Sequence, residues 1–371
     1  MQTMHSTLLI GHYDWEPQQV PKEEFEARFA DLWKRVPSSV VAIAAFGDRR
    51  SNAELVYLTN FVPKLRDALA IIPRTGEPKL YVAGAGNMMP IAARQTWIKT
   101  PPTPLSEPGK ALSEWKLTNN GPIAFVGGEN LRLALRKSVD EIVDAEATKL
   151  AGDGIREMMR SKRPQELQVI RRGCAILRAM ADALKAAHGA GRGVTAAVIE
   201  AEHVGNKMGA QEVRTLLSLD GGRTLRPFLV PVDKVIDPLQ VFLSVRFNGY
   251  WAEGHVTMSK AANPAADKAR AVLNGLIGAA KAGATAANLN KVFKDGLGAS
   301  SEHPVTAGSA GTGIGLALEE APRLSIASGE SLQPGDVCSL RAGVSNDAGH
   351  HAIVSAMVAV TASGNEVLWS S

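Results

Sequence analysis

One long amphipathic segment in the middle of the chain most constrains how it can fold. From Leu167 to Leu184 apolar residues recur at steps of three and four positions, which is the spacing of one buried helix face. Pro164 fits the first turn of such a helix, Ser161 could cap it, and Gly189 and Gly191 would end it. The pattern predicts a single long helix from near Pro164 to near Gly189.

The chain has different patterns on the two sides of this helix. Before it, a helical stretch at about residues 22–36 precedes short strand-type runs at 40–46, 57–59, 68–72, 80–82 and 123–128. After it come a helix at 194–208, strand-like segments at 241–247 and 250–258, a helix at 265–282, and strands at 335–340 and 351–361. We predict an α+β protein with a smaller α/β N-terminal domain, residues 1–155, and a larger domain, residues 156–371.

Charge and cysteine content argue against several classes of function. The net charge is +4, and the lysines and arginines are scattered without a basic run, so no nucleic-acid partner is expected. Cys174 and Cys338 are the only cysteines, which fits a reducing compartment. No signal-peptide pattern is present, and no apolar run reaches the roughly 18 residues that span a bilayer. We expect a cytoplasmic protein with no membrane partner.

A set of short segments carries more information in its order and spacing than any one segment does. They are Tyr57-Leu58-Thr59-Asn60-Phe61, Arg160-Ser161-Lys162-Arg163-Pro164-Gln165-Glu166-Leu167, Asn248-Gly249-Tyr250-Trp251-Ala252-Glu253, Gly311-Thr312-Gly313-Ile314-Gly315, Glu319-Glu320-Ala321-Pro322 and Leu332-Gln333-Pro334-Gly335-Asp336-Val337. This set, which covers nearly the whole chain, resembles the creatinase, aminopeptidase P and methionine aminopeptidase family. The resemblance implies a C-terminal pita-bread domain, a creatinase-type N-terminal domain and a homodimer.

The resemblance also implies a pair of metal ions held by two aspartates, one histidine and two glutamates. The first aspartate position falls within Phe242-Leu243-Ser244, and the others correspond to Glu253, Thr312, Arg341 and Ser355. One carboxylate cannot hold two divalent ions, and a guanidinium opposes any cation. We therefore predict that the chain binds no metal and needs no cofactor.

The side chains that replace these ligands predict a different chemistry. Because alternate residues of a strand share a face, Glu253 and His255 would point the same way, as would His351 and Ser355. We assign His255 as the proton carrier, with Glu253 or His351 to assist it. Arg341 would anchor an anionic group of a small-molecule substrate. The remaining candidate substrate-binding residues are Arg226, Thr312, Ser355, Tyr250 and Arg66.

These assignments lead to a hypothesis of a metal-independent hydrolase that cleaves a C–N bond, of amide or amidino type, in a small carboxylate-bearing substrate. Creatinase itself does not fit, because its catalytic histidine would fall near Arg226 and its guanidinium-binding glutamates at His255 and Arg341. One alternative is a catalytically inactive binding or scaffold protein in which Glu253 and Arg341 form a buried salt bridge. Others are a lyase or isomerase with the same acid–base site, or an enzyme with one metal on Glu253, His255 and His351.

Overall fold

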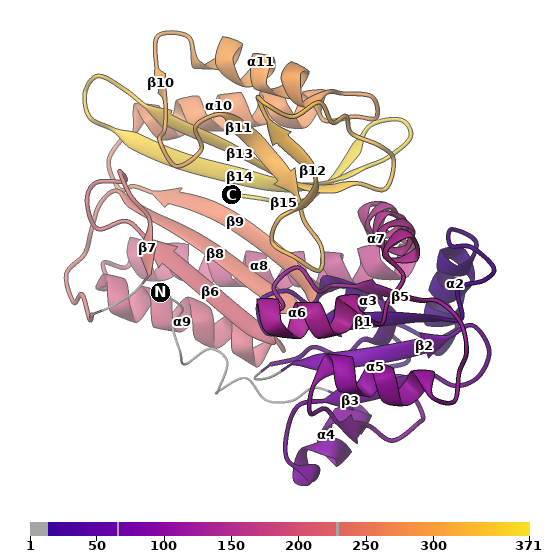
Figure 1. Cartoon of the computed structure of the whole chain (residues 1–371). Coiled ribbons are helices and arrows are strands. Elements are labelled where there is room, and N and C mark those ends of the chain that lie inside the picture. Colours follow the sequence, from indigo (N-terminus) through magenta and orange to yellow (C-terminus); the bar gives the residue numbers. More distant parts are fainter. Residues whose placement is uncertain (1–13, 65–66, 228–229) are drawn as a thin grey trace. The chain divides into compact units, whose positions relative to one another are not determined.

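The computed structural model describes residues 14–64, 67–227 and 230–371, and the chain forms two compact units (Figure 1). The N-terminal unit ends at Met159 and the C-terminal unit begins at Arg160. Helix α7 (Ala145–Arg160) spans residues 155 and 156, between which the domain boundary predicted from the sequence falls. Both units mix helices with sheets, which confirms the predicted α+β class. No helix of the described segments is long and apolar enough to cross a bilayer.

The N-terminal unit is built on one five-stranded sheet with helices packed against it. Its other elements are α2 (Lys22–Trp33), β1 (Ala42–Gly47), α3 (Ala53–Thr59), β2 (Ala68–Pro73), β3 (Lys79–Val82), η1 (Gly86–Met88), α4 (Met89–Arg94), β4 (Thr103–Pro104), α5 (Pro108–Lys116), β5 (Ile123–Val126) and α6 (Leu133–Asp140). The strand order is β4-β3-β2-β1-β5, with β1 antiparallel to β2 and parallel to β5. Alternate side chains of β1 pack with α5 and α6 in one apolar core.

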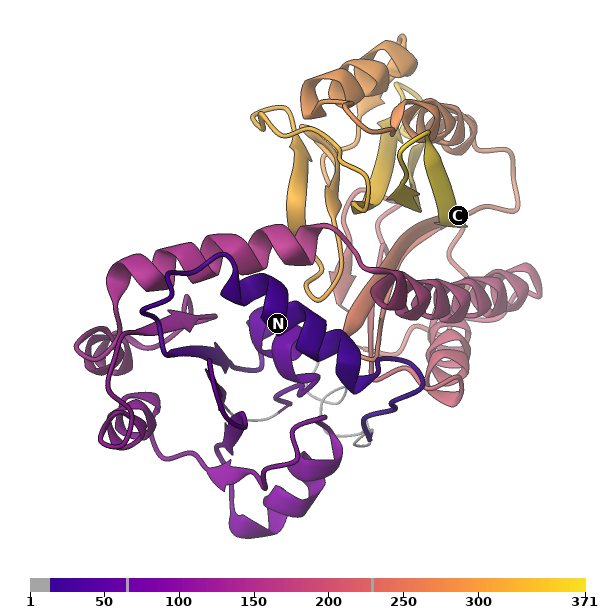
Figure 2. The ribbon, with the colours of Figure 1, turned by 90° about the vertical axis from the view of Figure 1, so that its right-hand side faces the viewer.

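The C-terminal unit contains two sheets between two pairs of helices. Its elements are α8 (Pro164–Gly189), α9 (Val194–Lys207), β6 (Glu212–Leu217), β7 (Arg226–Pro227), β8 (Leu239–Phe247), β9 (Tyr250–Met258), α10 (Pro264–Ala279), α11 (Ala286–Leu297), β10 (Ser301–Glu302), β11 (Ser309–Gly313), β12 (Glu320–Ser325), β13 (Val337–Ser345), β14 (His351–Val360) and β15 (Asn365–Ser370). The smaller sheet has the order β7-β6-β8-β9, and the larger runs β12-β11-β13-β14-β15 with β10 on β13. Figure 2 shows the orange helices α10 and α11 and the pink helices α8 and α9 with the strands between them.

The two sheets of this unit meet where β9 packs beside β14. The Thr257 hydroxyl donates a hydrogen bond to the carbonyl oxygen of Ile353 at 2.8 Å, and the Ile353 N–H donates to the Thr257 hydroxyl at 3.0 Å. The backbone N–H of His255 donates to the Ser355 hydroxyl at 2.7 Å. These side-chain bonds join two strands that belong to different sheets, so they fix the inner faces of the sheets against each other.

The long helix is confirmed, and its bounds Pro164–Gly189 are the predicted ones. Its N-cap is not the predicted Ser161 but Arg163, whose N–H donates to the Glu166 carboxylate at 3.0 Å in a capping box. The strand expected at residues 57–59 is wrong, because these residues form the last turn of α3. Leu55 to Thr59 are all buried, so no alternation of exposed and buried positions distinguished helix from strand there.

The close packing of β9 against β15 gives a stability prediction. A Cβ at Gly254 would collide with the ring of Trp369, a fully buried side chain. We expect Gly254→Ala to lower the free energy of unfolding by about 1–3 kcal/mol, the usual cost of overpacking a core. Gly278→Ala is the matched control, because Gly278 is exposed near the end of α10 with open space around it.

Urea denaturation of both variants measures the two effects. Gly278→Ala should be neutral or stabilising by up to about 1 kcal/mol, since alanine has the higher helix propensity. Equal stabilities of the two variants would contradict this account of the β9–β15 packing.

Candidate functional site

Four of the singled-out positions lie opposite one another in pairs of neighbouring strands. In the smaller sheet Ser244 of β8 is the register partner of Glu253 in β9. In the larger sheet Arg341 of β13 is the partner of Ser355 in β14. The residues directly before and after Arg341 and Ser355 in their strands point to the opposite face and pack into the core under α10 and α11. Arg341 and Ser355 therefore face away from those helices, on the side where β14 meets β9.

An ion pair joins the two sheets at this place. The Arg341 Nη2 donates to the Glu253 Oε1 at 2.6 Å, a short charge-assisted hydrogen bond. The Glu253 side chain is only 2% exposed and that of Arg341 is 22% exposed. A carboxylate so deeply buried requires a compensating partner, because an isolated charge loses its hydration without replacement. Arg341 supplies that partner from the other sheet.

Several buried polar groups near this pair have no hydrogen-bond partner within the described segments. They are the Arg341 Nε and the hydroxyls of Ser244 and Ser339. Ser339 lies two positions before Arg341, and Ser244 lies opposite Glu253. Leaving such a buried group unsatisfied costs roughly 1–3 kcal/mol, so these donors and acceptors are available to a bound molecule.

His255 lies in this region but its ring is held in a weakly basic state. Burial, the Arg341 guanidinium and His303 together lower its pKa to about 3. Its ring packs against that of Phe242, with 4.9 Å between the ring centroids. Among the residues described, none hydrogen-bonds to the His255 ring. A neutral imidazole with such a low pKa and no orienting partner is poorly suited to carry a proton near neutral pH.

His303 was not anticipated from the sequence, and it forms a second polar centre with His351. Its Nδ1 accepts the N–H of Val305 at 3.1 Å, and its Nε2 lies 2.6 Å from the carbonyl oxygen of Gly222, so Nε2 carries the proton. The His351 ring is edge-on to it at 5.7 Å and bonds to the Ser345 hydroxyl at 2.8 Å. Burial lowers the pKa of both imidazoles. No motif marked His303, because it lies in the irregular segment before β11.

The remaining candidates make contacts that hold the scaffold. The Tyr250 hydroxyl donates to the Glu166 Oε1 at 2.9 Å, which ties β9 to the cap of α8. The Thr312 hydroxyl donates to the carbonyl oxygen of Glu320 at 3.2 Å, across β11 and β12. Arg226 is exposed, and its Nε donates to the Thr224 hydroxyl at 3.1 Å. Arg66 lies outside the described residues.

The donor set of this region does not fit a pair of metal ions. Among the five family ligand positions Glu253 is the one carboxylate, and it already accepts from a guanidinium. Ser244, Thr312 and Ser355 contribute only neutral hydroxyls, which are weak ligands for a divalent cation. Within the described segments, no group of three or more histidines, cysteines or carboxylates is arranged to hold a metal ion. No reaction step can be derived through a metal held by these residues.

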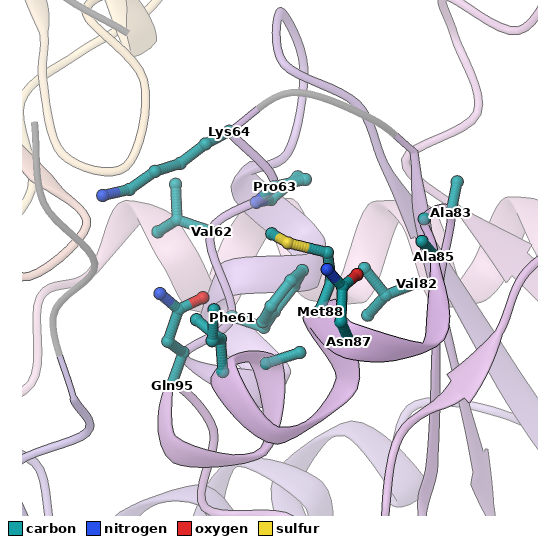
Figure 3. A pocket seen from close by; sticks show the side chains of 13 residues that line it. Phe61, Val62, Pro63, Lys64, Val82, Ala83, Ala85, Asn87, Met88 and Gln95 are labelled. Carbon is teal, nitrogen blue, oxygen red and sulfur yellow. The ribbon is translucent and has the colours of Figure 1, made fainter. Parts of the chain in front are cut away.

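A separate cavity of about 330 Å³ lies in the N-terminal unit (Figure 3). Its walls are mainly apolar and include Phe61, Val62 and Met88, with Lys64 at its edge. Among the described residues, the lining includes no acid, histidine or cysteine that could form an acid–base pair.

Comparison with known proteins identifies what this arrangement is similar to. The sequence pattern of metallopeptidase family M24 matches residues 168–362. The structure is similar to an Xaa-Pro dipeptidase from Bacillus anthracis, with a TM-score of 0.72, 16% identity, and 93% of this chain and 97% of that chain covered. An X-Pro aminopeptidase from Thermotoga maritima has a TM-score of 0.71, 17% identity, and coverage of 92% and 96%. The prolidase from Pyrococcus horikoshii has a TM-score of 0.70, 16% identity, and coverage of 94% and 98%. No curated protein matches the chain.

These structural likenesses show that the chain has the creatinase and aminopeptidase P fold, as the motifs predicted.

The ion pair gives a prediction for stability. Arg341→Met leaves the buried Glu253 without its partner, and we expect a loss approaching the about 3–5 kcal/mol that is typical of a broken buried pair. In the double variant Glu253→Met/Arg341→Met no buried charge remains, so most of the loss should be recovered. A double-mutant cycle by urea denaturation measures the coupling. Additive effects of the two single substitutions would show that the pair contributes no interaction energy.

The lowered pKa of His255 gives a prediction for pH dependence. Between the ordinary value of 6.5 and about 3, the unfolded chain binds a proton that the folded chain excludes. The free energy of unfolding therefore falls as the pH falls through this window, by up to about 1.4 kcal/mol per pH unit from His255 alone. His255→Phe should remove that part of the slope.

Chemical denaturation at pH 4 to 7 measures this slope. His203→Asn, which replaces an exposed histidine on α9, is the matched control and should leave the slope in place. Identical slopes for the wild type and His255→Phe would show that His255 is not the group that titrates.

Proposed function

The chain belongs to metallopeptidase family M24, and we propose that it is a metal-independent member that binds a small carboxylate-bearing molecule in its C-terminal unit. The observation that carries this proposal is the 2.6 Å ion pair between Arg341 and Glu253. In the family pattern set out above, both positions hold metal-binding carboxylates. Here one of them is a fixed cation, which repels metal ions and attracts anions.

The hydrogen-bonding state of Arg341 favours a carboxylate as the ligand. A guanidinium binds a carboxylate through two parallel N–H groups, and the Arg341 Nε is a buried donor without a partner in the described part of the chain. The hydroxyls of Ser244 and Ser339 are further free donors. The side chain of Arg341 keeps 22% of its surface exposed, although its Nε is buried. The structural relatives named Xaa-Pro dipeptidase act on dipeptides, which carry a carboxylate of this kind.

Binding without catalysis is the activity that the geometry supports best. Hydrolysis requires a group that takes a proton from water, and the His255 imidazole, with a pKa of about 3, is a weak base. Glu253 is held by Arg341. The site as it stands therefore recognises an anion but has no free general base. The same argument applies to a lyase or isomerase that would use these groups.

A second candidate is metal-independent hydrolysis of a C–N bond, and the contact between Glu253 and Arg341 favours it. A ligand carboxylate that binds Arg341 would compete with Glu253 for the same guanidinium. The released Glu253 would then be a buried carboxylate without a cation, and such a group has a raised proton affinity. In that state Glu253 would act as the general base toward water, and substrate binding itself would create the catalyst.

Calorimetry with glycylproline and with its C-terminal amide distinguishes these possibilities. We expect the dipeptide to bind and the amide to bind at least tenfold more weakly, because only the dipeptide offers Arg341 a carboxylate. Arg341→Met should abolish the difference between the two ligands. Arg270→Met, at an exposed arginine on α10 of the same unit, is the matched control. Equal binding of both ligands to the wild type would refute the carboxylate assignment.

Release of proline from glycylproline in the presence of a chelator would favour metal-independent hydrolysis over binding alone.

Elemental analysis tests the metal prediction separately. Protein purified without chelator should contain no stoichiometric zinc, manganese or iron, and manganese should leave its melting temperature unchanged. A positive control restores the family pattern through Ser244→Asp, Glu253→Asp, Thr312→His, Arg341→Glu and Ser355→Glu. The restored variant should be stabilised by manganese. Stoichiometric metal in the wild type would overturn metal independence.

A further inference from the structure

A second, highly polar cavity lies at one edge of the N-terminal sheet. Its volume is about 440 Å³, within the roughly 300–1,000 Å³ of small-molecule sites. The charged residues that line it are Asp48, Arg49, Arg50, Asp67 and Arg132. Asp48 directly follows β1, Arg132 follows β5, and Asp67 directly precedes β2. Because β1 and β5 are parallel, their carboxyl ends meet at the same edge, where ligands of α/β sheets commonly bind.

The guanidinium groups of the three arginines in this cavity have donors that the described part of the chain leaves open, although the charge of Arg132 acts on nearby Asp67. In the described segments, no ion pair or hydrogen bond involves the guanidinium of Arg49, Arg50 or Arg132. Other arginines of the same unit are paired, such as Arg136 with Asp140 at 2.7 Å and Arg35 with Glu157 at 2.6 Å. The cavity lining holds three guanidinium groups against two carboxylates, an excess of one positive charge. Guanidinium groups that no carboxylate contacts directly have N–H donors left for a phosphate group, which they bind through paired N–H groups.

The backbone holds the arginine-bearing segments in fixed positions. The Asp48 carboxylate accepts the N–H groups of Arg50 at 2.6 Å and Ser51 at 2.7 Å, which fixes the turn after β1. After β5, Gly127 has φ +77°, and a Cβ there would collide with the carbonyl oxygen of Phe46. This glycine lets the two strand ends approach closely. Arg132 is the N-cap of α6, so the positive end of that helix adds to the charge of the guanidinium.

The two aspartates restrict what the rest of the ligand can be. Asp67 is partly buried, and burial together with the nearby Asp48 raises its pKa against the opposing effect of Arg132. A second anionic group on the ligand would be repelled by these two carboxylates. A hydroxyl group, in contrast, donates to a carboxylate and accepts from a protonated carboxyl. The arginines of the cavity therefore suit a phosphate, and its two carboxylates suit neutral hydroxyls.

We propose that this cavity binds a small molecule that carries both a phosphate and free hydroxyl groups, of the sugar phosphate or nucleotide class. All residues that form the site belong to the N-terminal unit. The proposal is therefore independent of the ion pair in the C-terminal unit and of the carboxylate ligand proposed there.

Isothermal titration calorimetry of the full chain with ribose 5-phosphate, inorganic phosphate and ribose tests the proposal. We expect ribose 5-phosphate to bind more tightly than phosphate, and ribose alone to give no detectable heat. Arg132→Ala and Arg49→Ala should each weaken binding at least tenfold. Both side chains lie at least partly in solvent, so the variants should fold, and their melting temperatures without ligand verify this.

Arg136→Ala is the matched control, because it removes the same charge from α6 at a position that does not line the cavity. Its affinity for ribose 5-phosphate should equal that of the wild type. No binding of ribose 5-phosphate at millimolar concentration would overturn the proposal. So would equal affinities for phosphate and ribose 5-phosphate, or an equal loss of affinity in Arg136→Ala and Arg132→Ala.

Discussion

The buried carboxylate of Glu253 is the constraint on which the rest of the C-terminal unit depends. A charge that is only 2% exposed must be compensated, and Arg341 compensates it at 2.6 Å from another sheet. The two residues lie 88 positions apart, so the pair exists only if β9 and β13 are held at a fixed separation. The bonds of Thr257 and His255 to β14 hold that separation. The ion pair therefore depends on the packing of the two sheets, and the packed sheets in turn need the ion pair to compensate the buried charge of Glu253.

The same scaffold that holds metal ligands in other members of the family can hold an ion pair, because the backbone sets positions while the side chains set the charge. Ser244 opposite Glu253 and Arg341 opposite Ser355 are the register pairs that bring the family's ligand positions together. In the function proposed above, a guanidinium in place of a carboxylate at one of them changes the preferred ligand from a cation to an anion. Membership of the family establishes the fold, whereas the chemistry of the site depends on its side chains.

The two candidate binding regions differ in how their arginines are paired. In the C-terminal unit Arg341 is committed to Glu253, with its Nε left over. In the N-terminal unit Arg49, Arg50 and Arg132 gather around one cavity without a carboxylate bound to any of them in the described segments. Paired cations mainly stabilise a fold, whereas neighbouring unpaired cations raise the local potential for a ligand. The net charge of the chain does not reveal this distinction, because the distinction depends on which charged side chains lie close together.

The sequence by itself determined the features that depend on local pattern. Apolar residues at steps of three and four gave the helix Pro164–Gly189, and strand alternation placed Glu253 and His255 on one face of β9. Motif order gave the fold. The tertiary structure decided the features that depend on contacts between distant residues. It paired Glu253 with Arg341, a possibility that the sequence left open, and lowered the pKa of His255 through burial and that same arginine. It also made residues 57–59 helical within a fully buried segment. Burial and charge proximity are properties of the packed chain, and no local pattern encodes them.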